Sequence, residues 1–376
     1  MKISNLRDIR KSWLLHGDPP GDDLEAVLGS TVYRSWQRCM QSGLEAYQKS
    51  LPDNILSGQI LQSRIEQRSD LINLAKPTMN YLHGLMSGSG GVILLSDHQG
   101  VIVHSVGDAE FVMKADRVYL KPGASWMEKD RGTNAIGTAL VEGLPVSING
   151  SEHFLELNGF LSCAAAPIYM PDGSITGVLD ISTDKSTYHP HTIGLVKATV
   201  HSLEKQLFYA AEKQYCIIVK LHPNLEGLGS MAEGILGLGE DGLILGADRA
   251  ALAYLGLASI DIVNVKFHQI VDYSLDKVFD CAKSDQCVRE LRTHTDKRLC
   301  FDFSMSRSYC RTHAPVTTTI KTVNPTDSLV DAGPLRHVSR LLVEKMLASC
   351  DGNVSLAAKR LGISRSTLYR YLKEAH

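Results

Sequence analysis

Long apolar runs are absent from this 376-residue sequence. No stretch approaches the roughly 18–20 apolar residues that a membrane-spanning helix needs. The N-terminus, MKISNLRDIRKSWLL, lacks the apolar core of a signal peptide. We therefore expect a cytoplasmic protein without a membrane partner. The length allows about two or three domains, and a composition of 44% hydrophobic and 21% charged residues is typical of globular proteins.

Paired cysteine spacings are also absent. The chain has no C-x-x-C pair, and its cysteines are scattered at positions 39, 163, 216, 281, 287, 300, 310 and 350. This pattern favours reduced thiols over disulfides or a zinc site, so no metal is expected. His268, Cys281, Cys287, His294 and Cys300 could serve haem or a redox switch. Their spacing matches no ligation pattern, however, which favours ordinary structural roles.

A nucleotide-binding loop is missing as well. The sequence contains no G-x-x-x-x-G-K-[ST] motif, whose backbone amides and lysine would hold phosphates. The glycine-rich run 87–91 has no lysine after it and leads into an expected strand, so we interpret it as a turn. We expect no ATP hydrolysis and no enzyme activity, and we assign no catalytic residue.

The charge of the chain is unevenly distributed. Residues 336–376 carry eight Lys or Arg and three Asp or Glu, hence +5, whereas the formal charge of the whole chain is −2. The first 335 residues therefore carry −7. Positive charge concentrated in one small module is the electrostatic pattern of phosphate-backbone binding.

Residues 351–376, DGNVSLAAKRLGISRSTLYRYLKEAH, predict two short helices joined at Gly362, with Ser364 as the second N-cap. Leu368 and Leu372 share the inward face of the second helix at i and i+4. The candidate DNA-binding residues are Arg365, Ser366, Thr367, Tyr369, Arg370 and Lys373. An ordinary solvated helix hairpin is the alternative, which the local charge disfavours. The stretch resembles a Fis-type helix-turn-helix in 352–353, 357–358, 361–363, 365 and 367–370, and this resemblance implies binding to double-stranded DNA.

Residues 71–214 predict a domain with one antiparallel sheet flanked by helices. The clearest local signal is the turn 97–100, DHQG, between two apolar strands. Thr133 is the expected N-cap of a helix. The expected elements are helix 71–86, strands 91–96 and 101–104, helix 133–141, strands 145–148, 163–169 and 177–181, and helix 190–211.

Residues 221–323 predict a second strand-rich domain. A hairpin over 234–246 is followed by a helix that Asp248 caps and that runs to Leu255. Further strands are expected at 298–304 and 316–323. The predicted fold class is α+β and multidomain. Residues 1–70 form a helical segment before the first domain, and the linker 324–335 leads to the all-α module 336–376.

Residues 126–140, WMEKDRGTNAIGTAL, resemble the GAF domain of the acetoin-catabolism type of bacterial enhancer-binding regulators, as do 152–168 and 177–180. The run 35–39, SWQRC, matches the N-terminal segment of that family, and the second domain resembles a PAS fold. The family has an ATPase domain before its helix-turn-helix. Here only 324–334 lies there, far below the roughly 50 residues of a small domain.

The GAF-like domain offers a candidate small-molecule site. Trp126, Asn134, His153, Phe160 and Cys163 would supply the apolar wall and the few polar groups that such a site needs. The alternative is that Trp126 and Phe160 are core residues and His153 a surface loop residue. Cys163 is expected as a small buried thiol rather than a covalent nucleophile.

We therefore expect a ligand-responsive, sequence-specific transcription regulator that acts without ATP hydrolysis and whose effector is unidentified. A homodimer is expected because a helix-turn-helix uses two half-sites. The apolar stripes of 190–211 and 336–348 are candidate dimer interfaces. Packing within the core of one chain would also explain both stripes. RNA polymerase or a related regulator is a further candidate partner. The alternatives are an accessory factor or antagonist of an ATPase-containing relative, and a thiol-based catalytic GAF domain that uses Cys163.

Overall fold

The computed structural model describes residues 6–16, 24–51, 55–86, 88, 90–258, 265–284, 287–307, 309 and 354. All but the last belong to one compact unit, residues 1–314. The predicted strand 316–323, the linker 324–335 and, apart from residue 354, the predicted helix-turn-helix at 336–376 lie outside the described residues. The candidate DNA-binding residues therefore remain sequence-based predictions.

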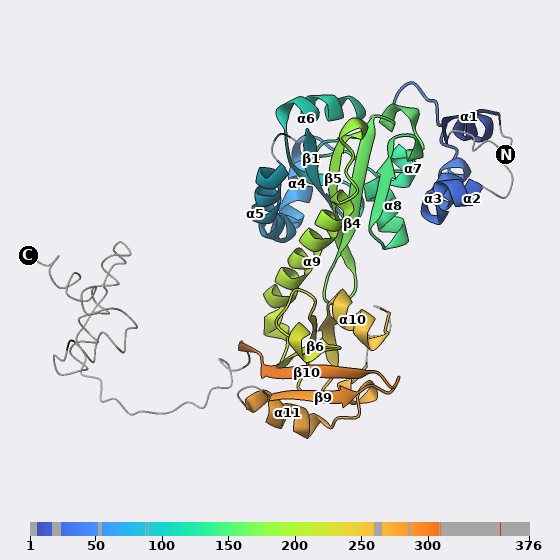
Figure 1. The fold of residues 1–376 in the computed structure, drawn as a ribbon. Coiled ribbons are helices and arrows are strands. Elements are labelled where there is room, and N and C mark those ends of the chain that lie inside the picture. Colours follow the sequence, from blue (N-terminus) through green and yellow to red (C-terminus); the bar gives the residue numbers. More distant parts are fainter. Residues whose placement is uncertain are drawn as a thin grey trace, which may run out of the picture. The chain divides into compact units, whose positions relative to one another are not determined.

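The first sheet has five antiparallel strands (Figure 1), in the order β2-β1-β5-β4-β3. The strands are β1 (Gly91–Asp97), β2 (Ile102–Gly107), β3 (Val146–Asn149), β4 (Leu161–Tyr169) and β5 (Ile175–Asp184). Each expected strand of this domain is present, and the turn 97–100 does join β1 to β2. Because alternate residues of a strand point to opposite faces, each face of the sheet has its own core.

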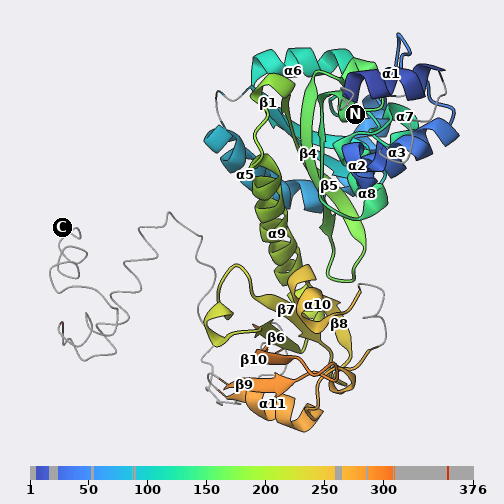
Figure 2. The ribbon, with the colours of Figure 1, turned by 45° about the vertical axis from the view of Figure 1, so that its right-hand side comes forward.

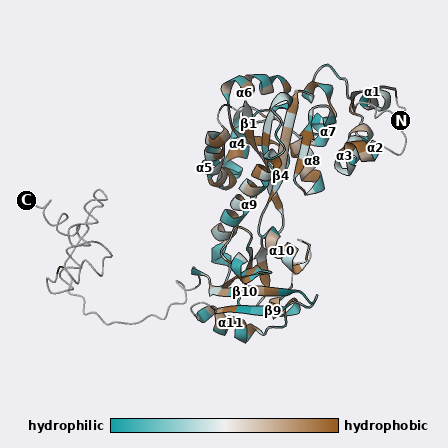
Figure 3. Cartoon of the chain, in the orientation of Figure 1, coloured by the Kyte–Doolittle hydropathy of each residue, from teal (hydrophilic) through white to brown (hydrophobic). Residues whose placement is uncertain are grey.

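Helices cover both faces of the first sheet. On one face, α5 (Ser69–Met86) and α9 (Thr192–Ala210) enclose Ile93, Leu95 and Ile181. On the other, α6 (Ala109–Ala115), α7 (Glu128–Arg131) and α8 (Ala135–Glu142) lie over Val92 and Leu94. Figure 3 shows hydrophobic colour along α8 and the strands that it covers. We refer to this second face as the α8 face.

The apolar stripe of α9 packs inside the chain itself. Val196, Val200, Leu203 and Leu207 are all buried in the core between α9, α5 and the sheet. Core packing therefore accounts for this stripe, and its residues are not available as the dimer seam that the sequence suggested.

The first three N-terminal helices share the core of the α8 face. They are α1 (Leu6–His16), α2 (Leu24–Leu28) and α3 (Ser30–Gln41). The next helix, α4 (Gly58–Gln67), instead packs Ile65 against the core on the α5 and α9 face. Trp36 and Cys39 of α3 are fully buried in the same cluster as Trp126, and the Trp36 Nε1–H donates to the Glu152 carbonyl at 2.8 Å. Figures 1 and 2 show α3 beside α7 and α8. The described helices within the segment 1–70 thus pack as part of the first domain.

A buried carboxylate holds α3 in place. Arg38 donates to both Glu128 oxygens, at 2.7 and 2.8 Å. The hydroxyls of Ser35 and Thr138 donate to Glu128 Oε1 at 2.6 and 2.8 Å. Arg38 Nη1 also reaches Glu142 at 2.9 Å. These contacts explain Ser35 and Arg38 of the SWQRC run, whose side chains bind Glu128 of the 126–140 motif. We call this set of contacts the Glu128 network.

The second sheet is also antiparallel, in the order β8-β7-β6-β10-β9. Its strands are β6 (Ile217–His222), β7 (Gly234–Leu238), β8 (Ile244–Ala247), β9 (Cys287–Arg292) and β10 (Arg298–Met305), with helices α10 (Arg249–Leu255) and α11 (Leu275–Lys283). The Asp248 side chain accepts from Ala251 N at 2.8 Å, which confirms the predicted cap of α10. The predicted domain start at 221 falls inside β6, the central strand, which the sequence analysis did not identify.

Short 3-10 helices complete the described chain, at Asp116–Val118, Gly150–Glu152, Glu156–Asn158, Lys185–Thr187, Glu212–Gln214, Leu225–Gly227 and Phe267–Gln269. No helix within the described ranges is both long and apolar enough to cross a membrane. The α+β class with two antiparallel sheets is confirmed.

Cys281 and Cys287 form a disulfide, with their Cα atoms 5.2 Å apart. The expectation of reduced thiols throughout is wrong for this pair. Cys281 lies near the end of α11 and Cys287 begins β9, so a reversal of the chain over six residues brings them together. Cys39, Cys163 and Cys300 are not part of a disulfide.

The Glu128 network predicts a large stability effect. Glu128→Gln would leave the Arg38 guanidinium beside a neutral amide, and we expect the free energy of unfolding to fall by roughly 3 kcal/mol. Urea unfolding followed by tryptophan fluorescence reports on this domain, since the three tryptophans of the chain are Trp13, Trp36 and Trp126. The control is Glu45→Gln, at an exposed carboxylate of the same domain, with an expected change within about 0.5 kcal/mol. A similarly small loss for Glu128→Gln would contradict the prediction.

Candidate functional site

The five predicted ligand-binding residues all belong to the first domain. Trp126, Asn134, His153 and Cys163 are buried, and Phe160 is half-buried. Trp126, Cys163 and Phe160 pack in the core of the α8 face. Burial excludes the alternative of His153 as a surface residue. It also shows that Trp126 contributes to the core, where its Nε1–H donates to the Tyr119 carbonyl at 3.0 Å. Ligand binding by these five residues remains a prediction.

Asn134, rather than Thr133, is the N-cap of α8. Its Oδ1 accepts from Gly137 N at 2.8 Å and its Nδ2 donates to the Gly132 carbonyl at 2.7 Å. The Thr133 hydroxyl lies instead 2.7 Å from the Ser35 hydroxyl. The predicted cap is therefore wrong by one residue, because a tertiary contact with α3 takes the threonine. Asn134 uses both ends of its amide to hold the local backbone.

His153 presents a buried acceptor. Its Nδ1 lies 3.0 Å from the Gly150 carbonyl, which can only accept, so Nδ1 carries the proton. Burial lowers the pKa of His153 to about 4, so the ring is neutral near pH 7. Its Nε2 then has a free lone pair and no hydrogen-bond partner among the described residues. A ligand with an N–H or O–H group could satisfy it.

Helix α1 closes over the backbone around His153. The Arg10 guanidinium is buried, donates to the His153 carbonyl and reaches the Phe154 carbonyl at 2.5 Å. Its Nε lies 3.1 Å from the Glu156 carboxylate. Burial is the largest influence on the pKa of Arg10 and lowers it, while Glu156 opposes that shift. The N-terminal helix is thus fastened to the loop that carries His153.

Phe160 lies at the edge of the same domain. The Lys114 ammonium sits over its ring, 4.9 Å from the centroid, and also pairs with Asp184. This contact fits a half-buried aromatic residue whose face is covered by a cation.

Cys163 belongs to a chain of buried polar groups that we call the polar cluster: Cys163, Asp180 and Ser182. The Ser182 hydroxyl lies 2.5 Å from Asp180 Oδ2 and 3.0 Å from Cys163 Sγ. Ser182 pairs with Cys163 across β4 and β5. Asp180 is two residues away on the same face of β5, within the predicted strand. The polar cluster therefore lies at the centre of the first sheet, on the α8 face.

The electrostatics of the polar cluster favour binding over nucleophilic chemistry. Burial raises the pKa of Cys163 well above its ordinary range, and the nearby Asp180 charge raises it further, so the thiol keeps its proton. Burial raises the pKa of Asp180 to about 7. Asp180 Oδ1 has no hydrogen-bond partner within the described chain. An unsatisfied carboxylate oxygen in a protein core is costly, and a bound donor would relieve that cost.

Asp180 and Ser182 were missed by the sequence analysis as site residues. Asp180 lies in the run 177–180 that carried the family resemblance. An acidic residue inside the apolar strand GVLDIS is unusual and could have indicated a site residue. Which face it occupies depends on the pairing of β5 with β1 and β4, where Asp180 lies opposite Leu94 and Ala165.

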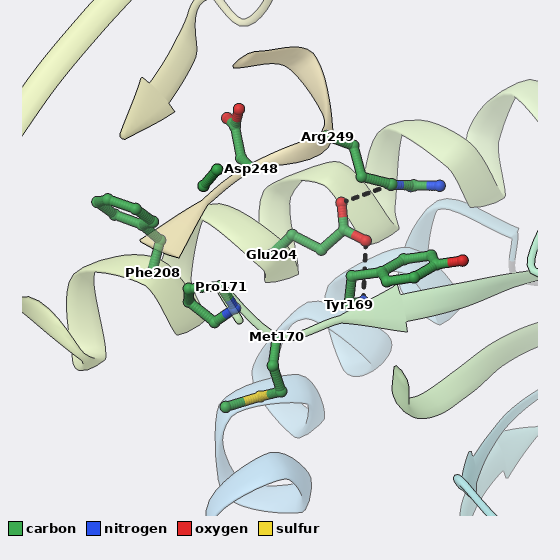
Figure 4. Close-up of a pocket in the computed structure, with 8 residues that line it drawn as sticks. Tyr169, Met170, Pro171, Glu204, Phe208, Asp248 and Arg249 are labelled. Atoms are coloured by element: carbon green, nitrogen blue, oxygen red, sulfur yellow. Dashed lines mark hydrogen bonds and ion pairs between the residues drawn. The ribbon is translucent and has the colours of Figure 1, made fainter. Parts of the chain in front are cut away.

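A second buried polar position lies where the β4–β5 turn meets α9 and the start of α10 (Figure 4). The cavity there measures about 10 Å³, which is the space of one water molecule. It is too small for an effector. No group of three or more His, Cys, Asp or Glu side chains in the described part of the chain could hold a metal ion.

The first domain and the basic C-terminal module both match families of bacterial transcription regulators. Residues 19–205 match the family described as MimR, N-terminal domain, and residues 334–374 match the bacterial regulatory protein, Fis family. The first match spans α3, the Glu128 network and the whole first sheet. The second confirms the Fis-type resemblance within two residues of the predicted module.

The chain is a homologue of acetoin- and MimR-type transcriptional activators. It is 35% identical over 183 residues to the acetoin dehydrogenase operon transcriptional activator AcoR of Bacillus subtilis, covering 49% of this chain and 30% of that one. It is 30% identical over 255 residues to the acetoin catabolism regulatory protein of Cupriavidus necator, covering 65% and 38%. The chain thus spans only about a third of the length of these relatives.

The chain is also similar to a solved structure, the Escherichia coli DhaR(N)-DhaL complex. The TM-score is 0.46 at 13% identity, with 73% of this chain and 98% of that chain covered.

The pKa of Asp180 predicts a pH-dependent stability. The folded carboxyl keeps its proton up to about pH 7, whereas the unfolded one releases it near 3.8. Its stabilising contribution is therefore complete below about pH 4 and is lost as the pH rises through about 7. Asp180→Asn removes this titration. The unfolding free energy of Asp180→Asn minus that of the wild type should therefore increase between pH 4 and 7, by at most roughly 4 kcal/mol.

Urea unfolding at several pH values measures this difference, with Glu45→Gln as the control. A difference between Asp180→Asn and wild type that stays constant from pH 4 to 7 would show that Asp180 is not held protonated by its surroundings.

Proposed function

We propose that the chain is a transcription regulator in which the first domain binds a small effector and residues 336–376 read DNA. The observation that carries the proposal is the joining of a MimR-type N-terminal domain to a Fis-family module in one chain. Relatives with this N-terminal region are named as regulators of transcription. The net charge of +5 on residues 336–376 supports binding to a phosphate backbone.

Effector binding is supported by two buried groups that have no partner among the described residues. His153 Nε2 is an acceptor at neutral pH, and Asp180 Oδ1 is an acceptor once the carboxyl is ionised, above about pH 7. A hydroxyl group on an effector can donate to His153 Nε2, and it can pair with Asp180 Oδ1 in either protonation state, since a hydroxyl both donates and accepts. We infer a small uncharged alcohol or hydroxyketone, which agrees with the acetoin-related names of the relatives.

The regulator would act without ATP hydrolysis. No phosphate-binding loop motif occurs in the sequence, and residues 324–335 are too few for an ATPase domain. Control would then come from occupying or leaving a DNA site, with RNA polymerase or a related regulator as the protein partner. A homodimer would supply two DNA-reading helices for the two half-sites.

An accessory or antagonist role is the second candidate within the same class. It is favoured by the missing phosphate loop and by the short interval, residues 324–335, before the Fis-family module. Such a chain would occupy the sites of an ATPase-containing relative without opening the promoter.

DNA reading makes a specific prediction about Arg370 and Lys373. Arg370→Ala should weaken binding to the preferred duplex by roughly 1–3 kcal/mol and relax preference at one position per half-site. Lys373→Ala should weaken binding on all duplexes alike and reduce the salt slope by about one. Both positions lie off the predicted face of Leu368 and Leu372, so folding should be unaffected.

The preferred duplex is first selected from a random library with the full chain, and binding is then titrated on it and on a scrambled duplex over a salt series. Retention of full discrimination by Arg370→Ala would mean that the recognition helix is misplaced.

The alternative of a thiol-based enzyme would require Cys163 to be an accessible, reactive thiolate. With a buried, protonated thiol, Cys163 should stay unmodified by iodoacetamide at pH 7.5 in the native protein and react only in urea. Cys300 is partly exposed and serves as the internal reference. Mass spectrometry of the digested protein locates the label. Rapid native labelling of Cys163, or its turnover with peroxide and a reductant, would favour the enzyme.

A further inference from the structure

The turn between β4 and β5 reaches the second domain. The Ala247 N–H, at the end of β8, donates to the Pro171 carbonyl at 2.9 Å. This is a backbone hydrogen bond between residues 76 positions apart in the sequence, so it does not arise from local chain geometry. It extends the edge of the second sheet onto the turn of the first.

Glu204 of α9 ties the same region together (Figure 4). Its carboxylate is buried, accepts from Tyr169 N at 3.0 Å and receives the Arg249 Nε–H at 3.2 Å. The Arg249 guanidinium also lies over the Tyr169 ring, 5.3 Å from the centroid. This α9 carboxylate therefore binds both the end of β4 and the first residue of α10.

Gly246 permits this close approach. A Cβ atom there would lie 2.5 Å from the Tyr215 hydroxyl and 2.9 Å from Pro171 Cβ, both shorter than a normal contact. Any larger residue must push the turn or the Tyr215 ring away. The glycine is thus explained by the packing of the turn against β8.

Helix α9 is fastened to the second domain on another side as well. His201 Nε2 lies 2.6 Å from the Met231 carbonyl, and the Lys205 ammonium lies 3.7 Å from the Glu233 carboxylate. Because these contacts fix α9 to the second domain, a shift of the first sheet relative to α9 would move the β4–β5 turn against β8. The turn is therefore the point at which such a shift would reach the second sheet.

We propose that Tyr169, Pro171, Glu204, Gly246, Ala247 and Arg249 form a coupling joint that passes the state of the polar cluster to the second domain. The two strands that carry the polar cluster also carry the turn. Cys163 and Tyr169 are both on β4, about 20 Å apart at the usual rise of a strand. Asp180 lies on β5, which starts directly after the turn. The relay rests on the proposed function, whereas the contact itself does not.

Hydrogen–deuterium exchange of the full chain, resolved to single amides, tests the joint without any effector. Gly246→Ala should raise the exchange rate of the Ala247 amide by about tenfold or more, since its bond to Pro171 is wedged open. Arg249→Met, which keeps side-chain length without the charge, should raise exchange at Tyr169 and Ala247. Gly194→Ala, in open space on α9, is the matched control and should leave both amides unchanged.

Unchanged exchange at Ala247 in both Gly246→Ala and Arg249→Met would overturn the joint. Arg249→Met keeps the test valid if Gly246→Ala unfolds the second domain, which exchange across β6 and β10 would reveal.

The relay is tested by a change at the other end of the strands. At pH 8 Asp180 is ionised in the wild type, and Asp180→Asn should change the exchange rate of the Ala247 amide several-fold. In the double variant with Gly246→Ala, Asp180→Asn should cause no further change in this rate relative to Gly246→Ala alone. An Ala247 rate equal to wild type in Asp180→Asn would overturn the relay. Duplex binding, measured separately, shows whether the proposed function itself fails.

Discussion

Burial of the Glu128 carboxylate is the constraint on which the first domain depends. An ionised carboxylate in a protein core is strongly unfavourable unless its charge and oxygens are paired. Arg38 and Ser35 supply that pairing from a helix some ninety residues earlier, and burial of Glu128 is possible only when α3 is docked. Helix α3 is therefore an integral part of the first domain, consistent with a family match that begins at residue 19.

The residues of the 126–140 motif have separate structural roles, one of which is to bind α3. Glu128 and Thr138 bind α3, Asn134 caps α8, and Trp126 fills the core. These structural roles account for much of the motif. Two of the buried groups that have no hydrogen-bond partner among the described residues lie outside this motif, at His153 and Asp180. The strongest sequence signal thus marks how the domain is built, whereas the weaker signals mark where it could bind.

Local signals in the sequence predicted local structure well. The β1–β2 hairpin and the Asp248 cap follow from residues within a few positions of each other, and both are confirmed. Thr133 and Asn134 are both good caps, and only the contact of Thr133 with Ser35 decides between them. The Cys281–Cys287 disulfide and the position of Asp180 depend on chain reversal and strand register, which no short motif encodes.

The polar cluster and the coupling joint give the first two domains a shared mechanism. The polar cluster lies on β4 and β5, and the coupling joint contains the turn between these strands, so occupation of the cluster and displacement of the turn act on the same pair of strands. Packed cores respond to small shifts by moving between discrete arrangements. An effector that supplies a hydrogen-bond donor to Asp180 would in this way alter the contact of Ala247 with the β4–β5 turn.

The central claim is that a sensor and a DNA-reading module act in one chain, and genome-wide occupancy in living cells tests it most directly. Chromatin immunoprecipitation of the full chain should give a small set of discrete sites, each with two half-sites about one helical turn apart. Removal of residues 336–376 should abolish these sites. Occupancy that is uniform, or identical with and without residues 336–376, would contradict the claim.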